Sequence, residues 1–194
     1  MLIVGTDVAA VEIELASGRL ACPRCESRLR PWAHARERDV RGDNAVVERR
    51  PRRTICSSCQ VTHVLLAEDT LSRRRDAVSV IGTALVAKSR GHGRRSIAAG
   101  LALHESTVAG WLRRFSQMAR LIREHFTRWA ALLDPGHGPI SSRGSVFRDA
   151  VEAIGVVGVV AVRRFGPRPP WALACRLTGG GLLTTRAHPY PSPM

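Results

Sequence analysis

The amino-acid sequence predicts an α+β protein, in which a small unit of β hairpins precedes an α-helical domain with extra C-terminal helices. Two observations lead to this prediction. The first third of the chain holds two CxxC cysteine pairs separated by short strand-like runs, and the remainder holds apolar residues at helical spacing. With 194 residues and 44% hydrophobic content, the chain can bury real cores in one medium domain or two small ones.

The two cysteine pairs predict a tetrahedral metal site. Two residues separate Cys22 from Cys25, two separate Cys56 from Cys59, and thirty residues lie between the pairs. This spacing lets both thiolates of a pair reach one ion from a tight turn, and two such turns complete the S₄ shell that suits Zn²⁺. We therefore expect a zinc ribbon with a structural Zn²⁺ over residues 20–68. Four free or disulfide-bonded cysteines are the alternative.

His63 and Cys175 also carry atoms that can bind zinc. His63 follows Cys59 by four residues and is a possible ligand, although four thiolates already complete the shell. Cys175 has no partner cysteine nearby in the sequence, and we interpret it as a small buried apolar residue. A reducing compartment also favours a metal over disulfides for the paired cysteines.

The charge of the chain indicates a polyanionic partner. Twenty-nine Arg and one Lys outnumber sixteen acidic residues, which gives a net charge of +14. The excess lies in two segments: residues 19–53 hold eleven Arg and five acids, and residues 71–128 hold twelve basic residues and three acids. This favours nucleic acid over a membrane surface as the partner. The preference for Arg over Lys is also typical of a GC-rich genome.

Neither a signal peptide nor a membrane span is expected. Met1 is followed by apolar residues without a basic region, and the longest apolar run, 153–162, is too short to cross a membrane. We therefore expect a cytoplasmic protein, associated with the nucleoid.

The N-terminal arm, residues 1–19, is expected to pack beside the ribbon. Residues 2–4 predict a short strand, and Thr6 or Asp7 can cap a following helix that Gly18 ends.

The ribbon itself is predicted to contain a hairpin formed by residues 27–39 and 44–55, with turn residues between them and a closing strand at 61–66. Pro51 has no N–H to donate, so its strand is expected to be an edge strand or to break there. Trp32 and the basic residues of these strands form either a basic binding face or an ordinary solvated surface, and the charge pattern favours neither. These basic residues are His34, Arg36, Arg38, Arg49, Arg50, Arg52 and Arg53.

Residues 69–133 predict three helices and an extension. Asp69 and Thr70 are expected to open the first helix, with residues 73–75 near its start and a stop at residues 91–93. The second is short, and the third has apolar residues at i, i+3, i+4 and i+7, which predict one buried stripe: Val108, Trp111, Leu112 and Phe115. Three helices with a short turn between the last two are typical of a helix-turn-helix unit.

Residues 96–115, SIAAGLALHESTVAGWLRRF, are similar to the helix-turn-helix of bacterial regulators, resolvases and insertion-sequence transposases. In that motif an Ile-Ala pair opens one helix, and a Ser/Thr-Val plus Trp-Leu pattern fills the recognition helix. The chain departs from it at Ala102, where glycine is common, and at His104, where Ser or Thr usually caps the helix. A weak cap costs about 1 kcal/mol, which the buried apolar stripe can offset.

In such a motif the start of the last helix faces the major groove of double-stranded DNA. The resemblance therefore places Glu105, Ser106, Thr107 and Gly110 in the groove, Arg113 and Arg114 at a guanine edge or a phosphate, and Arg94 and Arg95 at phosphates. An ordinary solvated helix face is the alternative for each arginine pair.

The C-terminal region is predicted to be partly helical. Apolar spacing continues through residues 119–133, which form a seam for their own chain or for a second copy, so a homodimer is possible. Within 134–166 a linker precedes a helix that Ser145 can cap, although its Val-rich centre also permits a strand. The Pro-rich and Gly-rich segment 167–194 predicts an irregular tail, with Pro189, Pro191 and Pro193 disordered.

Over residues 20–130 the chain resembles the DNA-binding front end of zinc-ribbon insertion-sequence transposases. It resembles more closely a domain-of-unknown-function family of small zinc-ribbon and helix-turn-helix proteins from high-GC bacteria. The features that match are the paired CxxC ribbon, the Arg-rich connector, the strand 62–66 and the Trp-Leu-Arg-Arg-Phe helix. The resemblance implies a non-enzymatic DNA-binding protein, such as a transcriptional regulator or a transposase-related module.

Two alternatives stay open: a truncated or accessory transposase or recombinase component, and a zinc-ribbon module for RNA or an acidic protein. Strand transfer needs a carboxylate triad that holds two Mg²⁺ ions on a strand-rich domain. Only four acids follow the helix-turn-helix segment, namely Glu124, Asp134, Asp149 and Glu152. The sequence shows no other catalytic motif, so we predict that the protein is not an enzyme.

Overall fold

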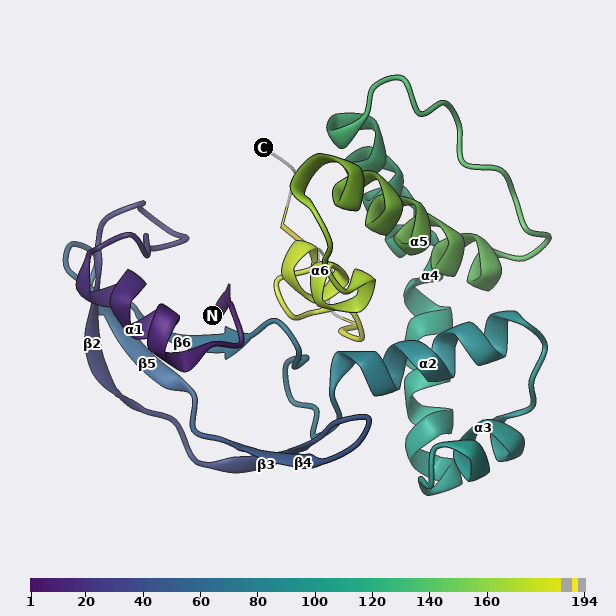
Figure 1. Ribbon diagram of the computed structural model, residues 1–194, viewed down its shortest axis with the longest axis horizontal. Coiled ribbons are helices and arrows are strands. Elements are labelled where there is room, and N and C mark those ends of the chain that lie inside the picture. Colours follow the sequence, from purple (N-terminus) through teal and green to yellow (C-terminus); the bar gives the residue numbers. More distant parts are fainter. Residues whose placement is uncertain (186–189, 192–194) are drawn as a thin grey trace.

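The computed structural model describes residues 1–185 and 190–191 and has a mixed α+β architecture. Its N-terminal, β-rich part, which includes one short helix, lies at one end of the molecule and the remaining helices at the other (Figure 1). In the described part of the chain the strands are β1 (Leu2–Val4), β2 (Leu29–His34), β3 (Arg38–Arg41), β4 (Val46–Arg49), β5 (Arg52–Cys56) and β6 (Thr62–Ala67). The helices are α1 (Val8–Ala16), α2 (Val78–Ser89), α3 (Arg94–Gly100), α4 (Glu105–Leu133), α5 (Val146–Phe165) and α6 (Pro170–Leu177).

The ribbon is a four-stranded sheet with the order β1-β6-β5-β2. Strand β1 pairs in parallel with β6, so the N-terminal arm joins the sheet of the ribbon. The long predicted hairpin is interrupted near its middle, because β4 ends at Arg49, Pro51 cannot donate, and β5 begins at Arg52. The interruption at Pro51 is confirmed, and the distal part of the hairpin, β3 and β4, forms a separate two-stranded sheet.

The first helix of the helical part begins later than predicted. Residues 69–77 form turns and isolated bridges, and α2 starts at Val78. The cause is a contact distant in sequence: Arg41 donates its N–H to the carbonyl of Arg75 (2.7 Å), and Ala77 donates its N–H to the carbonyl of Arg41 (2.8 Å). The backbone of 75–77 is therefore extended against β3, which also fixes the β3–β4 hairpin next to the helices.

The predicted helix starts at Asp7 and Ser145 are confirmed. Asp7 Oδ1 accepts from the N–H groups of Ala9 (2.9 Å) and Ala10 (3.2 Å), and Ser145 Oγ accepts from Arg148 N–H (3.3 Å). The Val-rich segment after Ser145 forms the helix α5, so the strand that its composition also permitted is excluded.

The expectation of an irregular tail after Gly166 is wrong for residues 170–177, which form α6. Pro170 occupies the first turn of this helix. The N–H groups of a first turn have no acceptor within the helix, so the N–H that proline lacks costs no hydrogen bond. Pro191 is exposed and outside regular secondary structure, whereas Pro189 and Pro193 lie outside the described residues.

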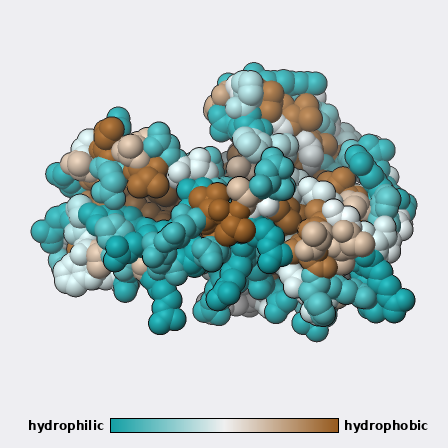
Figure 2. All heavy atoms as spheres, turned by 60° about the horizontal axis from the view of Figure 1, so that its bottom comes forward, coloured by the Kyte–Doolittle hydropathy of each residue, from teal (hydrophilic) through white to brown (hydrophobic). Residues whose placement is uncertain are grey.

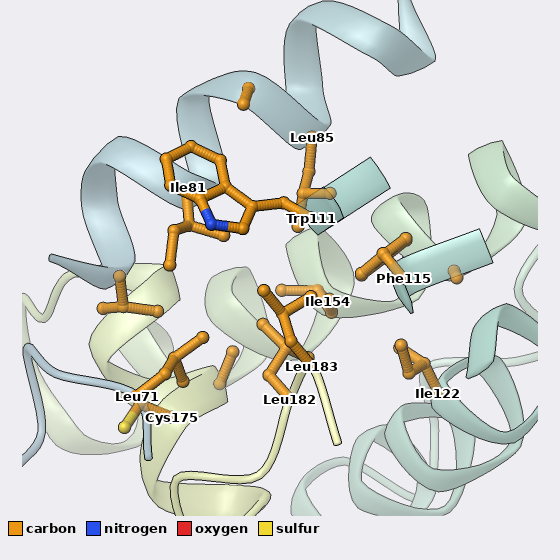
Figure 3. Packing of buried hydrophobic residues seen from close by; sticks show 14 of the residues in the cluster. Leu71, Ile81, Leu85, Trp111, Phe115, Ile122, Ile154, Cys175, Leu182 and Leu183 are labelled. Atoms are coloured by element: carbon orange, nitrogen blue, oxygen red, sulfur yellow. The ribbon is translucent and has the colours of Figure 1, made fainter. Parts of the chain in front are cut away.

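The larger core joins α2, α4, α5, α6 and the segment that follows α6. Figure 3 shows side chains from these elements pointing toward one another, among them Ile81 and Leu85 of α2, Phe115 and Ile122 of α4, and Ile154 of α5. The predicted seam along 119–133 belongs to this core: Ala119, Ile122 and Phe126 are buried against the rest of the same chain. The intramolecular use of the seam is thus confirmed.

One glycine allows α2 and α6 to approach closely. A Cβ atom added at Gly82 would lie 2.3 Å from the indole ring of Trp171. The absence of a side chain at Gly82 therefore lets this ring pack directly on the helix backbone.

The smaller core lies between α1 and the ribbon sheet. Val11 and Leu15 of α1 pack with Val4, Leu29 and Leu65, next to Cys22 and Cys56. The next residue of β6, Leu66, points to the other face of the sheet and belongs to the larger core, so β6 is shared by the two cores. Across residues 1–185 and 190–191, no helix combines the length and the apolar character needed to span a membrane.

Candidate metal centre and nucleic-acid interface

The two cysteine pairs occupy turns of the same construction. Cys22 donates its N–H to the carbonyl of Ser27 (2.8 Å), and Cys56 donates to that of Val61 (3.0 Å). The residue after the last cysteine of each pair has a left-handed backbone, with φ of 60° at Glu26 and 56° at Gln60. Strands β2 and β5 pair next to these turns, with Leu29 opposite Cys56, and this pairing brings the two turns together.

The four cysteine sulfur atoms lie within 4.8 Å of one another. Sγ of Cys22 is 3.8 Å from that of Cys59, and Sγ of Cys25 is 3.4 Å from that of Cys56. A tetrahedral thiolate site with Zn–S bonds of about 2.3 Å has S···S edges of about 3.8 Å. All five cysteines are described and none forms a disulfide, so the cluster can hold a metal ion and fits a zinc ribbon.

Hydrogen bonds and proximity give the thiols of this cluster different acidities. The backbone and hydroxyl of Ser27 lower the pKa of Cys25 to about 6. The pKa of Cys59 is raised to about 11, because burial and the neighbouring sulfurs outweigh the hydrogen bond from the backbone of Val61. Four thiols this close cannot all ionise without a cation, since each thiolate disfavours the next. A bound divalent ion would remove that penalty.

His63 lies beside the cysteine cluster and outside it. Its buried ring places Nε2 3.4 Å from Sγ of Cys22 and Nδ1 3.3 Å from the amino group of Met1. Burial lowers the pKa of His63, and the charge of the N-terminus lowers it further. The ring therefore packs against one sulfur from the side, and the four cysteines form the compact group.

Cys175 is far from this cluster in the fold. It is fully buried in the larger core, as predicted, and its Sγ donates to the carbonyl of Thr70 at 3.3 Å. Burial raises the pKa of Cys175 to about 12, which makes it an unreactive thiol.

The turn between α3 and α4 is closed by two hydrogen bonds at the end of α3. Ala102 donates its N–H to the carbonyl of Ala99 (3.1 Å), and Leu103 donates to that of Ala98 (2.9 Å). These are the two bonds of a Schellman ending, and Ala102 has the left-handed φ of 51° that this ending requires. His104 caps α4 through Nδ1, which accepts from the N–H of Ser106 at 3.3 Å. Ala102 and His104, which depart from the helix-turn-helix pattern in sequence, therefore support a tight turn.

Helix α4 has a buried face and a polar face at its start. Val108, Trp111, Leu112 and Phe115 are buried, which confirms the predicted stripe. Ser106 and Arg113 are exposed, and Glu105, Thr107, Gly110 and Arg114 are partly exposed. Arg114 also donates from Nη1 to the carbonyl of Gly110, one turn earlier on the same helix (3.3 Å).

Arg94, Arg95 and Glu105 form a connected group that the sequence did not reveal. Glu105 pairs with Nε of Arg94 and lies 3.4 Å from Nε of Arg95. The hydrogen bond from Arg94 lowers the pKa of Glu105, and the charge of Arg95 adds to this effect. Arg95 has 85% of its side chain exposed, so it is the freer of the two arginines. No sequence signal marks this pairing, because Glu105 follows Arg94 by eleven positions and a turn lies between them.

Two of the four acids that follow residue 115 form ion pairs with arginines. The buried carboxylate of Asp149 contacts Arg123 Nη1 (2.9 Å) and accepts from the backbone N–H of Arg143 (2.5 Å). Glu152 pairs with Arg143 at 2.7 Å. These contacts fasten the loop before α5 to the helices.

Figure 2 shows the lower face of Figure 1, where hydrophilic side chains extend from the ribbon toward the helical part and surround several hydrophobic patches.

Comparisons of the chain with protein-family models, curated protein sequences and solved structures returned no match.

Proposed function

We propose that this chain is a non-enzymatic DNA-binding protein whose cysteine cluster holds a structural Zn²⁺. The observation that supports it most is the start of α4, which exposes polar and basic side chains beyond a tight turn from α3 while its other face is buried. A net charge of +14 supports the same proposal, because nucleic acid is a polyanion.

Zinc is the metal proposed for the cluster because four thiolates in a tetrahedral arrangement suit this ion. Four sulfur ligands leave no open position for a water or a substrate, so the ion would serve the fold. The N–H groups of Ser58 and Cys59 both lie 3.4 Å from Sγ of Cys56, where they would help to stabilise a thiolate.

In the proposed complex, α3, the turn and α4 act as a helix-turn-helix, and the first turns of α4 enter the major groove. Ser106, Thr107 and Arg113 then face base edges or phosphates. Arg95 is the better placed of the α3 arginines for a phosphate, because Arg94 is already held by Glu105. A protein with these properties would be a regulator or a transposase-related DNA-binding module.

The DNA proposal is tested by titrating the zinc-loaded protein against a labelled random duplex at several salt concentrations. The log of the binding constant should fall linearly with log salt, with a slope of about −0.9 per phosphate neutralised. Replacing Arg113 and Arg114 together with Ala should weaken binding by about tenfold or more.

The matched control replaces Arg163 and Arg164, an adjacent and exposed arginine pair on another helix, and should change affinity by less than about threefold. Equal losses in the two double variants would show that binding does not use α4. Affinity that is independent of salt would contradict the DNA proposal as a whole.

The zinc proposal is tested separately by elemental analysis of protein purified without added metal. We expect one zinc per chain in the wild type and a loss of it in Cys56→Ser, whereas Cys175→Ser should retain it because Cys175 lies outside the cluster. Stoichiometric iron in the wild type, or retention of zinc by Cys56→Ser, would overturn the assignment.

A further inference from the structure

A cleft opens on the ribbon between α1, β6 and the turn that joins β4 to β5. Val4, Val11 and Leu65 form part of its apolar floor. Its accessible interior measures about 80 Å³, which is room for several water molecules or for one small chemical group. The cleft is separate from both the cysteine cluster and the start of α4.

The rim of this cleft is strongly basic. Four arginines line it, namely Arg38, Arg49, Arg50 and Arg52. Two of them have acidic partners: Nη2 of Arg49 lies 2.6 Å from Asp69, and Nε of Arg52 lies 3.2 Å from Glu12. In the part of the chain that the structure describes, neither Arg38 nor Arg50 forms an ion pair. The cleft therefore carries two positive charges, on Arg38 and Arg50, that no acidic side chain of the described residues pairs with.

Three of these guanidinium groups also have unused hydrogen-bond donors. The Nε atoms of Arg38, Arg49 and Arg52 are buried and have no hydrogen-bond partner among the described residues, although Nε of Arg52 lies within ion-pair distance of Glu12 (3.2 Å). Burial lowers the pKa of Arg38, as expected for a charge that has lost water without gaining a counterion. Buried donors and charges of this kind destabilise a fold unless an acceptor is supplied. An anion in the cleft would supply one.

We propose that this cleft binds a small organic phosphate, with its phosphate group on Arg38 and Arg50 and its apolar part on the floor formed by Val4, Val11 and Leu65. Arginine suits such a group because its planar guanidinium donates two parallel hydrogen bonds to phosphate oxygens. A phosphate monoester carries about two negative charges at neutral pH, which matches the excess in the cleft. The apolar floor favours an ester over the bare ion. This site does not depend on the DNA proposal, because it uses none of the residues assigned to DNA.

The test titrates phenyl phosphate into the zinc-loaded, full-length protein, with calorimetry and NMR of the arginine Nε–H groups as readouts. We expect saturable binding at one site and a shift of the Nε–H signal of Arg38. Arg38→Ala and Arg50→Ala should each weaken binding by about tenfold. Arg19→Ala, which removes an exposed arginine outside the cleft, should leave binding within twofold. Inorganic phosphate should bind more weakly than phenyl phosphate, because it cannot use the floor.

Equal effects of Arg38→Ala and Arg19→Ala would overturn the assignment, since binding would then follow net charge alone. Equal affinities for phenyl phosphate and inorganic phosphate would overturn the role of the apolar floor. Displacement of phenyl phosphate by a short DNA duplex would identify the nucleic-acid backbone as the source of the phosphate and would overturn the small-molecule assignment. If Arg38→Ala fails to fold, the exposed Arg50 decides the test.

Discussion

At the scale of single residues, four helices in the described part of the chain end in the same way, but one of them lacks the usual glycine. Helices α1, α2 and α6 are followed by Gly18, Gly91 and Gly179, all with positive φ. Helix α3 is followed by Ala102, whose φ of 51° brings its Cβ close to the backbone. The left-handed conformation costs an L-residue about 1–2 kcal/mol, so the turn before α4 is strained at this one residue.

Ala102→Gly is therefore expected to stabilise the protein. Relief of the strain outweighs the extra freedom that glycine has in the unfolded chain, and a net gain of about 0.5–1 kcal/mol should result. Urea unfolding monitored by circular dichroism measures the change. Gly91→Ala is the matched control at the equivalent position after α2 and should lose about 1 kcal/mol. A loss of stability in Ala102→Gly would show that the turn has another backbone conformation in solution.

The burial of Cys175 leads to a prediction about thiol reactivity. With a pKa of about 12, less than roughly one thiol in a thousand is ionised at pH 8, whereas Cys25, with a pKa of about 6, is mostly ionised. After chelation of the metal, iodoacetamide should modify Cys25 quickly and Cys175 only when the larger core unfolds. Mass spectrometry of peptides over a time course measures this order. Early labelling of Cys175 would contradict its placement in the core.

At the scale of elements, the sequence predicts what local chemistry determines. The cysteine turns, the cap at Asp7 and the stripe of α4 depend on residues within one or two turns of each other, and all were found. The late start of α2 was missed because it depends on backbone bonds to Arg41, more than thirty residues earlier. The arginine cleft was missed for the same reason: its lining comes from β1, α1, β3, β4, β5 and β6, and no spacing in the sequence indicates their assembly.

The link between α3 and α4 gives a prediction that tests the proposed DNA interface. Glu105 holds Arg94 and places a negative charge at the start of α4. Glu105→Gln would free Arg94 and remove that charge, so affinity for a random duplex should rise about threefold and the salt slope should steepen by about one phosphate. Glu124→Gln, which removes an exposed acid further along the same helix, should have a much smaller effect. Weaker binding by Glu105→Gln would instead indicate that the carboxylate contacts a base directly.

At the scale of the whole molecule, the two cores meet across the paired strands β1 and β6. Val4 and Leu65 face the ribbon core, whereas their neighbours Ile3 and Leu66 face the helical core. Further contacts join the same parts: Arg176 on α6 pairs with Glu68 at 2.8 Å, and Ser72 donates its N–H to the carbonyl of Gly180 at 2.9 Å. Strand β6 therefore connects the sheet that positions the cysteine cluster to the core of the helices.

Removal of the metal should unfold residues 20–68 and leave the helices of 70–133 folded but less stable. Leu66 would leave the helical core, and the loss of a buried leucine costs about 2–5 kcal/mol.

In zinc-loaded protein, Leu66→Ala should therefore lower the free energy of unfolding of the helices by this amount. Leu65→Ala should lower the free energy of unfolding of the ribbon alone. After chelation neither substitution should affect the helices, because β6 is already detached. Hydrogen exchange of the individual amides separates the two transitions. Simultaneous loss of protection in the ribbon and in α4 would show that the two parts form a single cooperative domain.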